Sequence, residues 1–192
     1  MADRIVDEIG SSVPEINPTL AKVLQYVALD AKETMIAEKS LVPFTAVVVK
    51  ENMFLEEMSS TETDHVYAEA QHTVQNVKGA EAYALCYDGY VDTDAGKHDA
   101  IIAEGGVPGE DTGYAVALVY ELNDGEYSFM NQVSYIGKAP NFMSHLNPDD
   151  KFVPADDGLE LIGGEATAEQ AADDQADGKE ADGKEAEGQK AE

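Results

Sequence analysis

The 192-residue sequence has no tryptophan, a single cysteine (Cys86) and no long apolar run. One cysteine excludes an intramolecular disulfide and every zinc site that is built from several thiolates. No segment approaches the roughly 20 consecutive apolar residues that a membrane-spanning helix needs. The first ten residues, MADRIVDEIG, also lack the basic and apolar regions of a signal peptide. These absences predict a cytoplasmic protein without a membrane segment.

Basic residues are scarce, because 12 lysines and arginines stand against 39 acidic residues, and only Arg4 is an arginine. The formal net charge of −27 repels the phosphates of nucleic acids and anionic membranes. The same field attracts cations and basic protein surfaces. We therefore expect no direct binding of nucleic acid or membrane, and a basic protein surface as the partner. An open alternative is that the acidity reflects adaptation of a whole proteome.

The last thirty residues, 163–192, form an acidic segment with the imperfect repeat ADGKE, ADGKE, AEGQK. They contain no aromatic residue and no Val, Leu, Ile or Phe, so they cannot bury enough apolar area to offset the entropy of ordering. We predict a disordered, low-complexity tail. Its ten acids and three lysines contribute −7 to the net charge, which leaves −20 in residues 1–162. The folded part is therefore strongly acidic itself.

The clearest helix signal lies near the N-terminus, where Asn17 is a good N-cap and Pro18 suits the first helical position. Apolar residues at helical spacing continue to about Glu38, and Pro43 prevents further extension. Residues 1–15 before this helix form an N-terminal segment of uncertain structure. Residues 16–136 read as a single domain.

Two strands at 44–49 and 53–58 follow, and a second helix is predicted from a capping box at Ser59 and Glu62 to about Gly79. The periodicity then changes to two, which predicts strands at 80–90, 98–104, 114–122 and 127–135. The expected order is α-β-β-α-β-β-β-β. Short turns between consecutive strands predict an antiparallel sheet of about five to six strands, and hence the α+β class.

Two of these strands have a bulky and a small face, and both faces are apolar. In strand 80–90, Tyr83, Leu85 and Tyr87 alternate with alanines and Cys86, and strand 114–122 repeats the pattern. A sheet that buried only one face would alternate apolar with polar residues. We therefore expect both faces to be covered, the small one by the long first helix. The alternative cover is a second subunit in a homodimer.

Residues 137–162 are rich in proline, asparagine and aspartate, which predicts irregular structure. Apolar residues such as Phe142, Met143 and Leu146 are interspersed among them. We interpret the segment as a strap that packs back onto the domain, or as a linker. The alternative is a docking segment for a partner, because exposed apolar residues would otherwise be a liability.

The candidate metal site lies on the second predicted helix. His65, Glu69 and His72 are spaced at i, i+4 and i+7 and so share one helix face. Two imidazoles and a carboxylate are the ligand types of a divalent metal site with open positions, and the same groups can relay protons. His98 or His145 would have to add ligands, because three residues on one straight helix seldom converge on one ion. The alternative is a solvated polar face.

Two further segments resemble known ligand-binding loops only in part. Asp92, Asp94 and Gly96 have part of the spacing of a calcium loop, but later ligands are missing, and a hairpin turn explains them. The glycine-rich stretch 104–113 has no lysine and precedes a strand, so it fits neither phosphate-binding fingerprint. We expect it to be a surface loop.

No motif specifies a reaction or a cofactor, and we expect Cys86 to be buried and inert. The preferred hypothesis is a non-enzymatic, acidic interaction domain that binds a basic protein. The alternative is a small metal-binding domain or enzyme that uses the His65, Glu69 and His72 face. A second alternative is a phosphate mimic directed at a nucleic-acid-binding protein, which requires acids arrayed in a strip on the domain.

Overall fold

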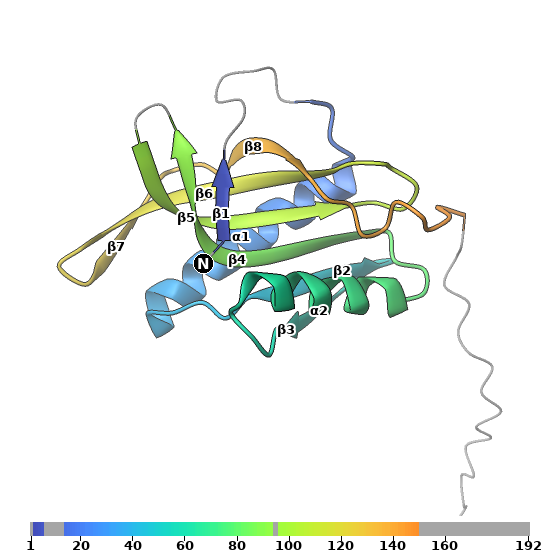
Figure 1. Ribbon diagram of the computed structural model, residues 1–192, viewed down its shortest axis with the longest axis horizontal. Coiled ribbons are helices and arrows are strands. Elements are labelled where there is room, and N and C mark those ends of the chain that lie inside the picture. The colour runs from blue at the N-terminus through green and yellow to red at the C-terminus, as the bar shows by residue number, and fades with distance from the viewer. Residues whose placement is uncertain (1, 6–13, 94–95, 150–192) are drawn as a thin grey trace, which may run out of the picture. The chain divides into compact units, whose positions relative to one another are not determined.

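The structure is a computed structural model that describes residues 2–5, 14–93 and 96–149. The described residues form two helices and eight strands, and from α1 through β7 their order is the predicted one (Figure 1). The elements are β1 (Ala2–Ile5), α1 (Pro18–Glu38), β2 (Phe44–Val49), β3 (Asn52–Glu57), α2 (Thr63–Asn76), β4 (Ala82–Thr93), β5 (Gly96–Gly106), β6 (Gly113–Asn123), β7 (Glu126–Phe129) and β8 (Ser134–Ala139). The α+β prediction is confirmed.

All of these strands belong to one sheet, whose path runs β3-β2-β4-β5-β6-β7. Every pairing along this path is antiparallel, as predicted. Two strands lie off the path: β1 pairs with β4 in parallel, and β8 pairs with β6. One edge of β4 is therefore shared, with β2 beside residues 82–86 and β1 beside residues 89–92.

Helix α1 begins and ends where the sequence predicts. The side chain of Asn17 accepts a hydrogen bond from the Thr19 amide at 2.9 Å, and Pro18 occupies the first turn. The left-handed Lys39 (φ 61°) ends the helix by donating its amide to the Met35 carbonyl. Capping at both ends satisfies backbone groups that helical hydrogen bonds leave free.

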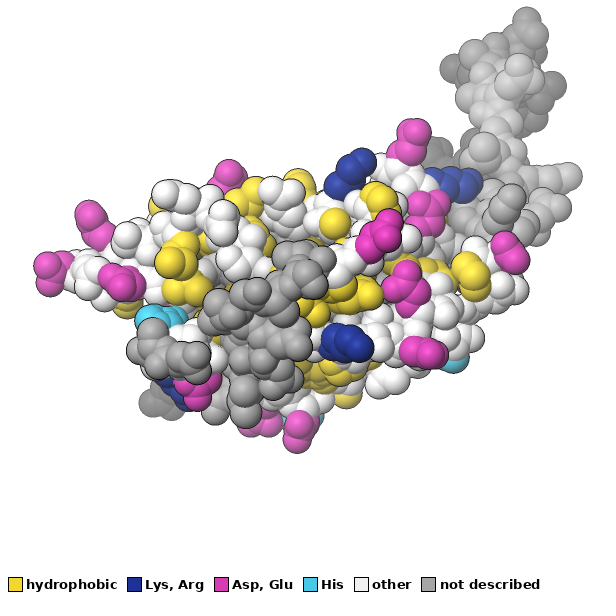
Figure 2. Space-filling model, turned by 90° about the horizontal axis from the view of Figure 1, so that it is seen from above, with side chains coloured by type: hydrophobic (Ala, Val, Ile, Leu, Met, Phe, Trp, Pro, Cys, Tyr) yellow, Lys and Arg dark blue, Asp and Glu magenta, His cyan; other side chains and the backbone are white. Residues whose placement is uncertain are grey.

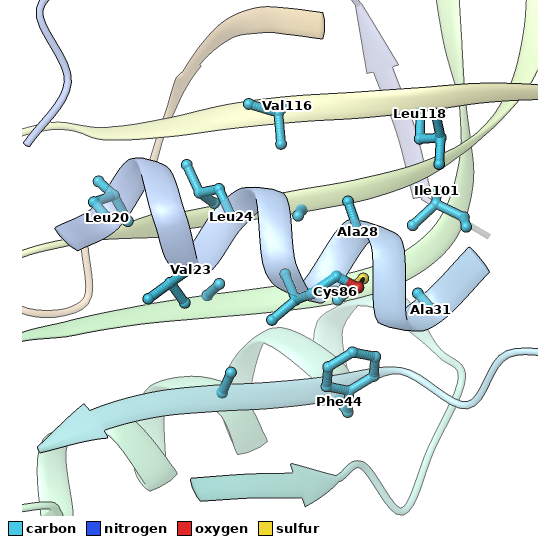
Figure 3. Close-up of a cluster of buried hydrophobic side chains, with 14 of the residues drawn as sticks. Leu20, Val23, Leu24, Ala28, Ala31, Phe44, Cys86, Ile101, Val116 and Leu118 are labelled. Carbon is cyan, nitrogen blue, oxygen red and sulfur yellow. Dashed lines mark hydrogen bonds between the residues drawn. The ribbon is translucent and has the colours of Figure 1, made fainter. Parts of the chain in front are cut away.

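Helix α1 covers one face of the sheet, and this face is small only in part. It carries the small side chains of β4, as expected, but the bulky Val116, Leu118 and Tyr120 of β6, so the prediction that α1 covers the small face is wrong for β6. The apolar stripe of α1 packs against Ala82, Ala84 and Cys86 of β4 and against Ile101 and Leu118 of the next strands (Figure 3). Cys86 is fully buried, and its Sγ donates to the Val27 carbonyl oxygen at 3.6 Å. The prediction that Cys86 is buried is confirmed, and burial raises the pKa of this thiol.

The opposite face is covered by α2 (Figure 1), over the bulky side chains of β4 and the small Ala115 and Ala117 of β6. Val66 and Ala70 pack on Leu85 and Tyr87 of β4, and Val74 packs with Tyr83. The predicted capping box is wrong, because the N-cap of α2 is Glu62 and no side chain caps the helix. Instead, the amide of Ser59 donates a hydrogen bond to the side chain of Glu69, which lies within α2.

The glycine-rich stretch 104–113 is not wholly a surface loop, which corrects the prediction. Glu104, Gly105 and Gly106 belong to β5 and are buried. A Cβ atom on Gly105 would lie 1.9 Å from the Tyr83 carbonyl oxygen of the neighbouring strand. Only glycine permits this approach of β5 to β4.

The predicted strand 127–135 is also wrong, because it is two strands. β7 ends at Phe129 and β8 begins at Ser134, and both pair with β6 at different places. A register shift between Ala115 and Val116 of β6 accompanies the β8 pairing.

After β8 the chain packs back onto the sheet face that α2 covers. Met143 is fully buried, and Phe142 and Leu146 pack against the same cluster, as the strap interpretation expects. The remainder of the predicted strap and the whole predicted tail, residues 150–192, lie outside the described residues, as do residues 6–13 of the N-terminal segment. No helix in the described part of the chain is long and apolar enough to cross a bilayer.

Candidate functional site

The described residues bury one carboxyl group within the core, that of Glu104, which is 3% exposed. A buried carboxyl is costly unless hydrogen bonds replace its water. The hydroxyl of Tyr67 donates to Glu104 Oε1, and the Tyr87 hydroxyl lies 3.4 Å from the Tyr67 hydroxyl. Since the one Tyr67 proton is directed at Glu104, Tyr87 is the donor in this second contact.

Three elements bring this cluster together. Tyr67 follows the buried Val66 on α2, Tyr87 lies on the bulky face of β4, and Glu104 is paired with Leu85 across the β4–β5 ladder. Residues that pair directly across a ladder share a face, so Glu104 lies under α2 with the tyrosines. Burial, and next the charge of Glu104, raise the pKa of Tyr67, which keeps this phenol a donor.

The strap continues the cluster on the same face. The Tyr83 hydroxyl donates to the Pro140 carbonyl oxygen and accepts from the Phe142 amide, both at 3.0 Å. The rings of Tyr83 and Phe142 stack with centroids 5.2 Å apart, and Tyr67 meets Phe142 edge to face. Aromatic contacts and hydrogen bonds thus fix residues 140–143 against β4 and α2.

A cavity of about 130 Å³ opens beside Tyr67 and Tyr87. Its lining combines three apolar side chains, four hydroxyls and one carboxyl: Leu41, Pro43, Val66, Thr61, Thr63, Tyr67, Tyr87 and Asp88. Pockets for drug-sized ligands measure roughly 300–1,000 Å³, so this one suits a ligand the size of a side chain.

Among the residues that the structure describes, Asp88 is the one charged residue that lines this cavity. Its Oδ1 accepts a hydrogen bond of 2.8 Å from the Tyr120 hydroxyl. Burial raises the pKa of Asp88, Tyr120 partly offsets this by hydrogen bonding to the charged form, and nearby Asp99 adds to the rise. Asp88 is therefore a partly desolvated carboxylate.

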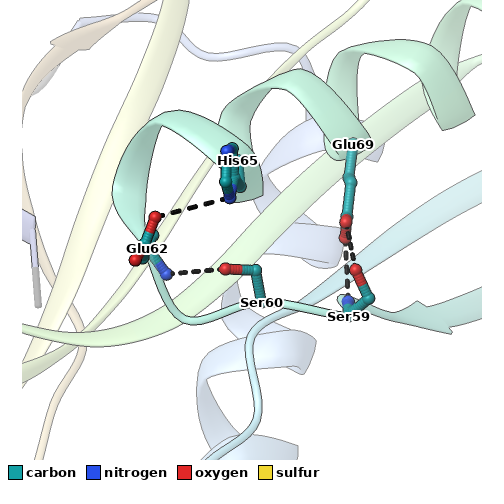
Figure 4. Close-up of polar contacts among 5 residues, drawn as sticks. All are labelled: Ser59, Ser60, Glu62, His65 and Glu69. Carbon is teal, nitrogen blue, oxygen red and sulfur yellow. Dashed lines mark hydrogen bonds and ion pairs between the residues drawn. The ribbon is translucent and has the colours of Figure 1, made fainter.

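The three residues of the predicted metal site lie on α2, and two of them, His65 and Glu69, contact residues outside the predicted site (Figure 4). His65 Nδ1 is 3.5 Å from Glu62 Oε2, with both side chains largely exposed. Glu69 accepts from the amide of Ser59 at 2.8 Å and from its hydroxyl, and these bonds lower the pKa of Glu69. His72 is exposed and contributes only a backbone carbonyl to a described hydrogen bond.

Within the described residues, no three His, Cys, Asp or Glu side chains are grouped as metal ligands would be, with or without His98 and His145. The metal hypothesis stays a prediction that calorimetric titration of zinc or nickel tests. Heat of binding at micromolar metal that disappears in Glu69→Gln supports it, and absence of heat at that concentration rejects it.

The other candidate loops have structural explanations in the described residues. Thr93 pairs with Gly96 at the end of the β4–β5 hairpin, and Thr93 Oγ1 donates to the Gly96 carbonyl at 3.0 Å. This is the predicted hairpin; residues 94 and 95 lie outside the described part.

The tyrosine–glutamate cluster and the cavity were not predicted. Glu104 directly follows the apolar run 100–103, which is a signal for a strand that continues into the core, but the two glycines after it favoured a loop. No family model, curated protein or solved structure matches this chain.

Proposed function

We propose that the protein is a non-enzymatic interaction domain that binds a basic protein partner, and that the edge strand β3 is the contact surface. The observation that carries this proposal is the composition of that edge. Phe54 and Leu55 are 58% and 52% exposed, and they lie between Glu51 on one side and Glu56 and Glu57 on the other.

The outer side of β3 is open for strand pairing. Among the described strands β3 pairs only with β2. The Val48 carbonyl oxygen of β2 accepts a hydrogen bond from the Glu81 amide, so the backbone groups of Val48 point away from β3. Successive residues of an antiparallel strand direct their backbone groups to opposite sides, so those of the residues next to Val48 point toward β3. By the same alternation, the backbone groups of Met53, Leu55 and Glu57 point outward. An exposed row of this kind binds extended segments as an added strand.

The side chains of β3 offer contacts on both faces of such an added strand. Phe54 is opposite Val47 on the α2 face, whereas Leu55 is opposite Ala46 on the α1 face. Neither helix reaches far enough to cover these two residues, as their exposure indicates. A partner strand with apolar residues on both faces would bury them.

Charge selects the kind of partner. Glu51, Glu56 and Glu57 are all exposed. Acidic side chains also outnumber basic ones on the face that Figure 2 shows from above, on the side away from β3. Opposite charges across a strand pair contribute about 0.2–1 kcal/mol each, and like charges oppose pairing. A basic extended segment is therefore favoured. A second copy of this chain is disfavoured, because it would place acids against acids.

The test uses a short peptide in which pairs of lysines alternate with pairs of valines, so that both faces of the strand carry both kinds of side chain, and a matched peptide with glutamate in place of lysine. We expect the lysine peptide to bind, with shifts of β3 amide resonances, and the glutamate peptide not to bind. Replacement of Glu56 and Glu57 by lysine should weaken binding about tenfold, the effect of reversing two favourable cross-strand pairs.

The control applies the same charge change elsewhere, with Glu121→Lys and Asp124→Lys at the exposed β6–β7 turn. Equal weakening in the control and in the β3 variant would show binding to net charge and would reject β3 as the contact. A chain that ends at Ile162 should retain binding. Its loss on truncation would assign the interaction to residues 163–192.

A further inference from the structure

A second cavity, of about 440 Å³, opens on the side of the sheet that α1 covers, between the first half of α1 and the chain that connects β7 to β8. Part of its lining belongs to the hydrophobic core. Leu24 of α1 is 1% exposed and Val116 of β6 is 9% exposed, and both lie in the core cluster beneath α1 (Figure 3). Leu29 and Val133 add further apolar side chains to the lining. The hydrophobic core therefore reaches the surface here.

The position of the cavity follows from the path of the chain beside α1. Along the second half of α1, β7 packs closely, and Lys32 Nζ lies 5.4 Å from the centroid of the Phe129 ring. β7 ends at Phe129, and residues 130–133 lie outside any helix or strand. Ala21, whose side chain is one methyl group, lines the cavity from α1 together with this connection. A small side chain opposite an irregular segment leaves the space open.

Three carboxamide side chains also line the cavity. Gln25 lies on α1, and Asn131 and Gln132 lie on the connection between β7 and β8. A carboxamide can both donate and accept hydrogen bonds. Among the hydrogen bonds that join described residues, none involves these three carboxamides. They can therefore bind a ligand without losing a contact within the described fold.

The charge of the lining limits the class of ligand. No Lys, Arg, His, Asp or Glu side chain is among the described residues that line this cavity. A cation would lose water there without gaining a counter-ion. An anion would have the same cost, and the chain's net charge of −27 would also repel it. An uncharged ligand avoids both costs.

We propose that this cavity binds a small uncharged amide that carries an apolar group. The volume of about 440 Å³ lies in the usual range for ligand pockets, roughly 300–1,000 Å³. Leu24, Leu29 and Val116 would contact the apolar group, while the carboxamides would exchange hydrogen bonds with the ligand amide. β6 and β3 lie far apart along the path of the sheet, so this site does not depend on the function proposed for β3.

The first test titrates N-acetyl-leucinamide into the full chain and follows backbone amides by NMR, which detects the weak binding expected of a ligand this small. N-acetyl-glycinamide lacks the apolar side chain, N-acetyl-leucine carries a negative charge, and leucinamide at about pH 6 carries a positive one. We expect saturable shifts at Gln25, Gln132 and Val133 with N-acetyl-leucinamide, and binding about tenfold weaker with each of the others. Equal binding of N-acetyl-glycinamide or of both charged ligands would overturn the proposal.

The second test fills the cavity. Ala21 is exposed on α1, so Ala21→Leu adds volume to the cavity lining at a position where leucine is compatible with the helix. Ala37→Leu is the matched control, because Ala37 is exposed on the same helix and is not among the described residues that line the cavity. We expect Ala21→Leu to weaken binding of N-acetyl-leucinamide about tenfold or more and the control to leave it unchanged. Equal affinity in both variants rejects the site.

The third test removes one carboxamide. Gln132→Leu should weaken binding of N-acetyl-leucinamide about fivefold, which corresponds to the loss of one hydrogen bond. Gln71→Leu makes the same change at an exposed position on α2 and should have no effect. If Gln132→Leu and Gln71→Leu bind equally well, the proposed recognition of the ligand amide is wrong.

The source of the ligand is identified with a capped pentapeptide that has one leucine between glycines. Binding as tight as that of N-acetyl-leucinamide identifies a leucine residue of a polypeptide as the occupant. Binding of the small amide alone identifies a free small molecule, and binding of neither rejects the site. Replacing Glu56 and Glu57 by lysine should leave the affinity for this uncharged ligand unchanged, so failure here and failure at β3 are distinguishable.

Discussion

The hydroxyl of Tyr67 donates a hydrogen bond to the carboxyl group of Glu104, which is 3% exposed. We predict that Tyr67→Phe lowers the free energy of unfolding by about 1.5 kcal/mol, because the buried carboxyl loses a donor that water does not replace. Urea denaturation measures the change. Tyr26→Phe is the matched control, since Tyr26 is 48% exposed and should change stability by less than about 0.5 kcal/mol.

Equal effects of the two substitutions would contradict the assignment of Glu104 to a stabilising contact. Tyr67→Phe retains the ring that packs edge to face against Phe142, so packing changes do not explain a difference.

Burial raises the pKa of Tyr67, Tyr83 and Tyr120 above the ordinary tyrosine value. In the unfolded chain these phenols lose protons near pH 10, whereas in the folded chain they keep them to higher pH. The unfolded state then binds fewer protons than the folded one. We therefore predict that the free energy of unfolding falls as pH rises above about 10.

Urea unfolding at several values between about pH 9 and pH 11 measures this slope. Lysines titrate in the same range, so the slope is compared between variants that differ only at tyrosine. Tyr120→Phe should make the decline shallower, and Tyr26→Phe should not. A slope that is identical in the wild type and Tyr120→Phe would refute the role of the buried phenols.

At the scale of elements, the close approach of β5 to β4 depends on Gly105. An added Cβ would clash with the Tyr83 carbonyl oxygen at 1.9 Å, and a backbone atom cannot move aside alone. We predict that Gly105→Ala lowers the free energy of unfolding by about 3 kcal/mol, the upper part of the usual range for overpacking.

Gly125→Ala is the comparison, because a Cβ there would meet no atom within 4 Å, although φ is +84°. Its cost should be about 1 kcal/mol, which comes from backbone conformation alone. Thermal or urea unfolding of both variants measures the two costs. A smaller loss for Gly105→Ala than for Gly125→Ala would show that the two strands separate easily at this point.

Prediction of the elements succeeded where the signal was local. The end signals of α1, Asn17 and Pro18, are neighbours in sequence and act on neighbouring backbone groups. Prediction failed at the start of α2 and in residues 127–135, because distant contacts decide both. Glu69 binds Ser59 in place of a cap, and β6 accepts β7 and β8 at separate places along one edge.

At the scale of the whole molecule, a net charge of −27 on 192 residues favours expansion through self-repulsion. We predict that raising NaCl from about 0.01 M to about 0.5 M, which shortens the screening length severalfold, raises the midpoint of thermal unfolding. A gain of about 1 kcal/mol would raise the midpoint by about 3 °C for a chain of this size.

A chain that ends at Ile162 keeps −20 of this charge and should show most of the same rise. Sucrose at equal osmolality distinguishes screening from general solvent effects, because it carries no ions. A midpoint that is independent of salt would mean that repulsion among the acids of the folded part is already relieved in the native state.

The sequence by itself determined the net charge and its division along the chain, the ends of α1 and the apolar faces of β4 and β6, because each depends on composition or on residues close together in the chain. Only the tertiary structure decided that Glu104 is buried beneath Tyr67, and that Tyr87 of β4 lines a cavity together with Val66 and Tyr67 of α2. Those features depend on pairing between segments separated by many residues. A single sequence contains no periodic signal for such pairing, since the contacts form only when the whole sheet assembles.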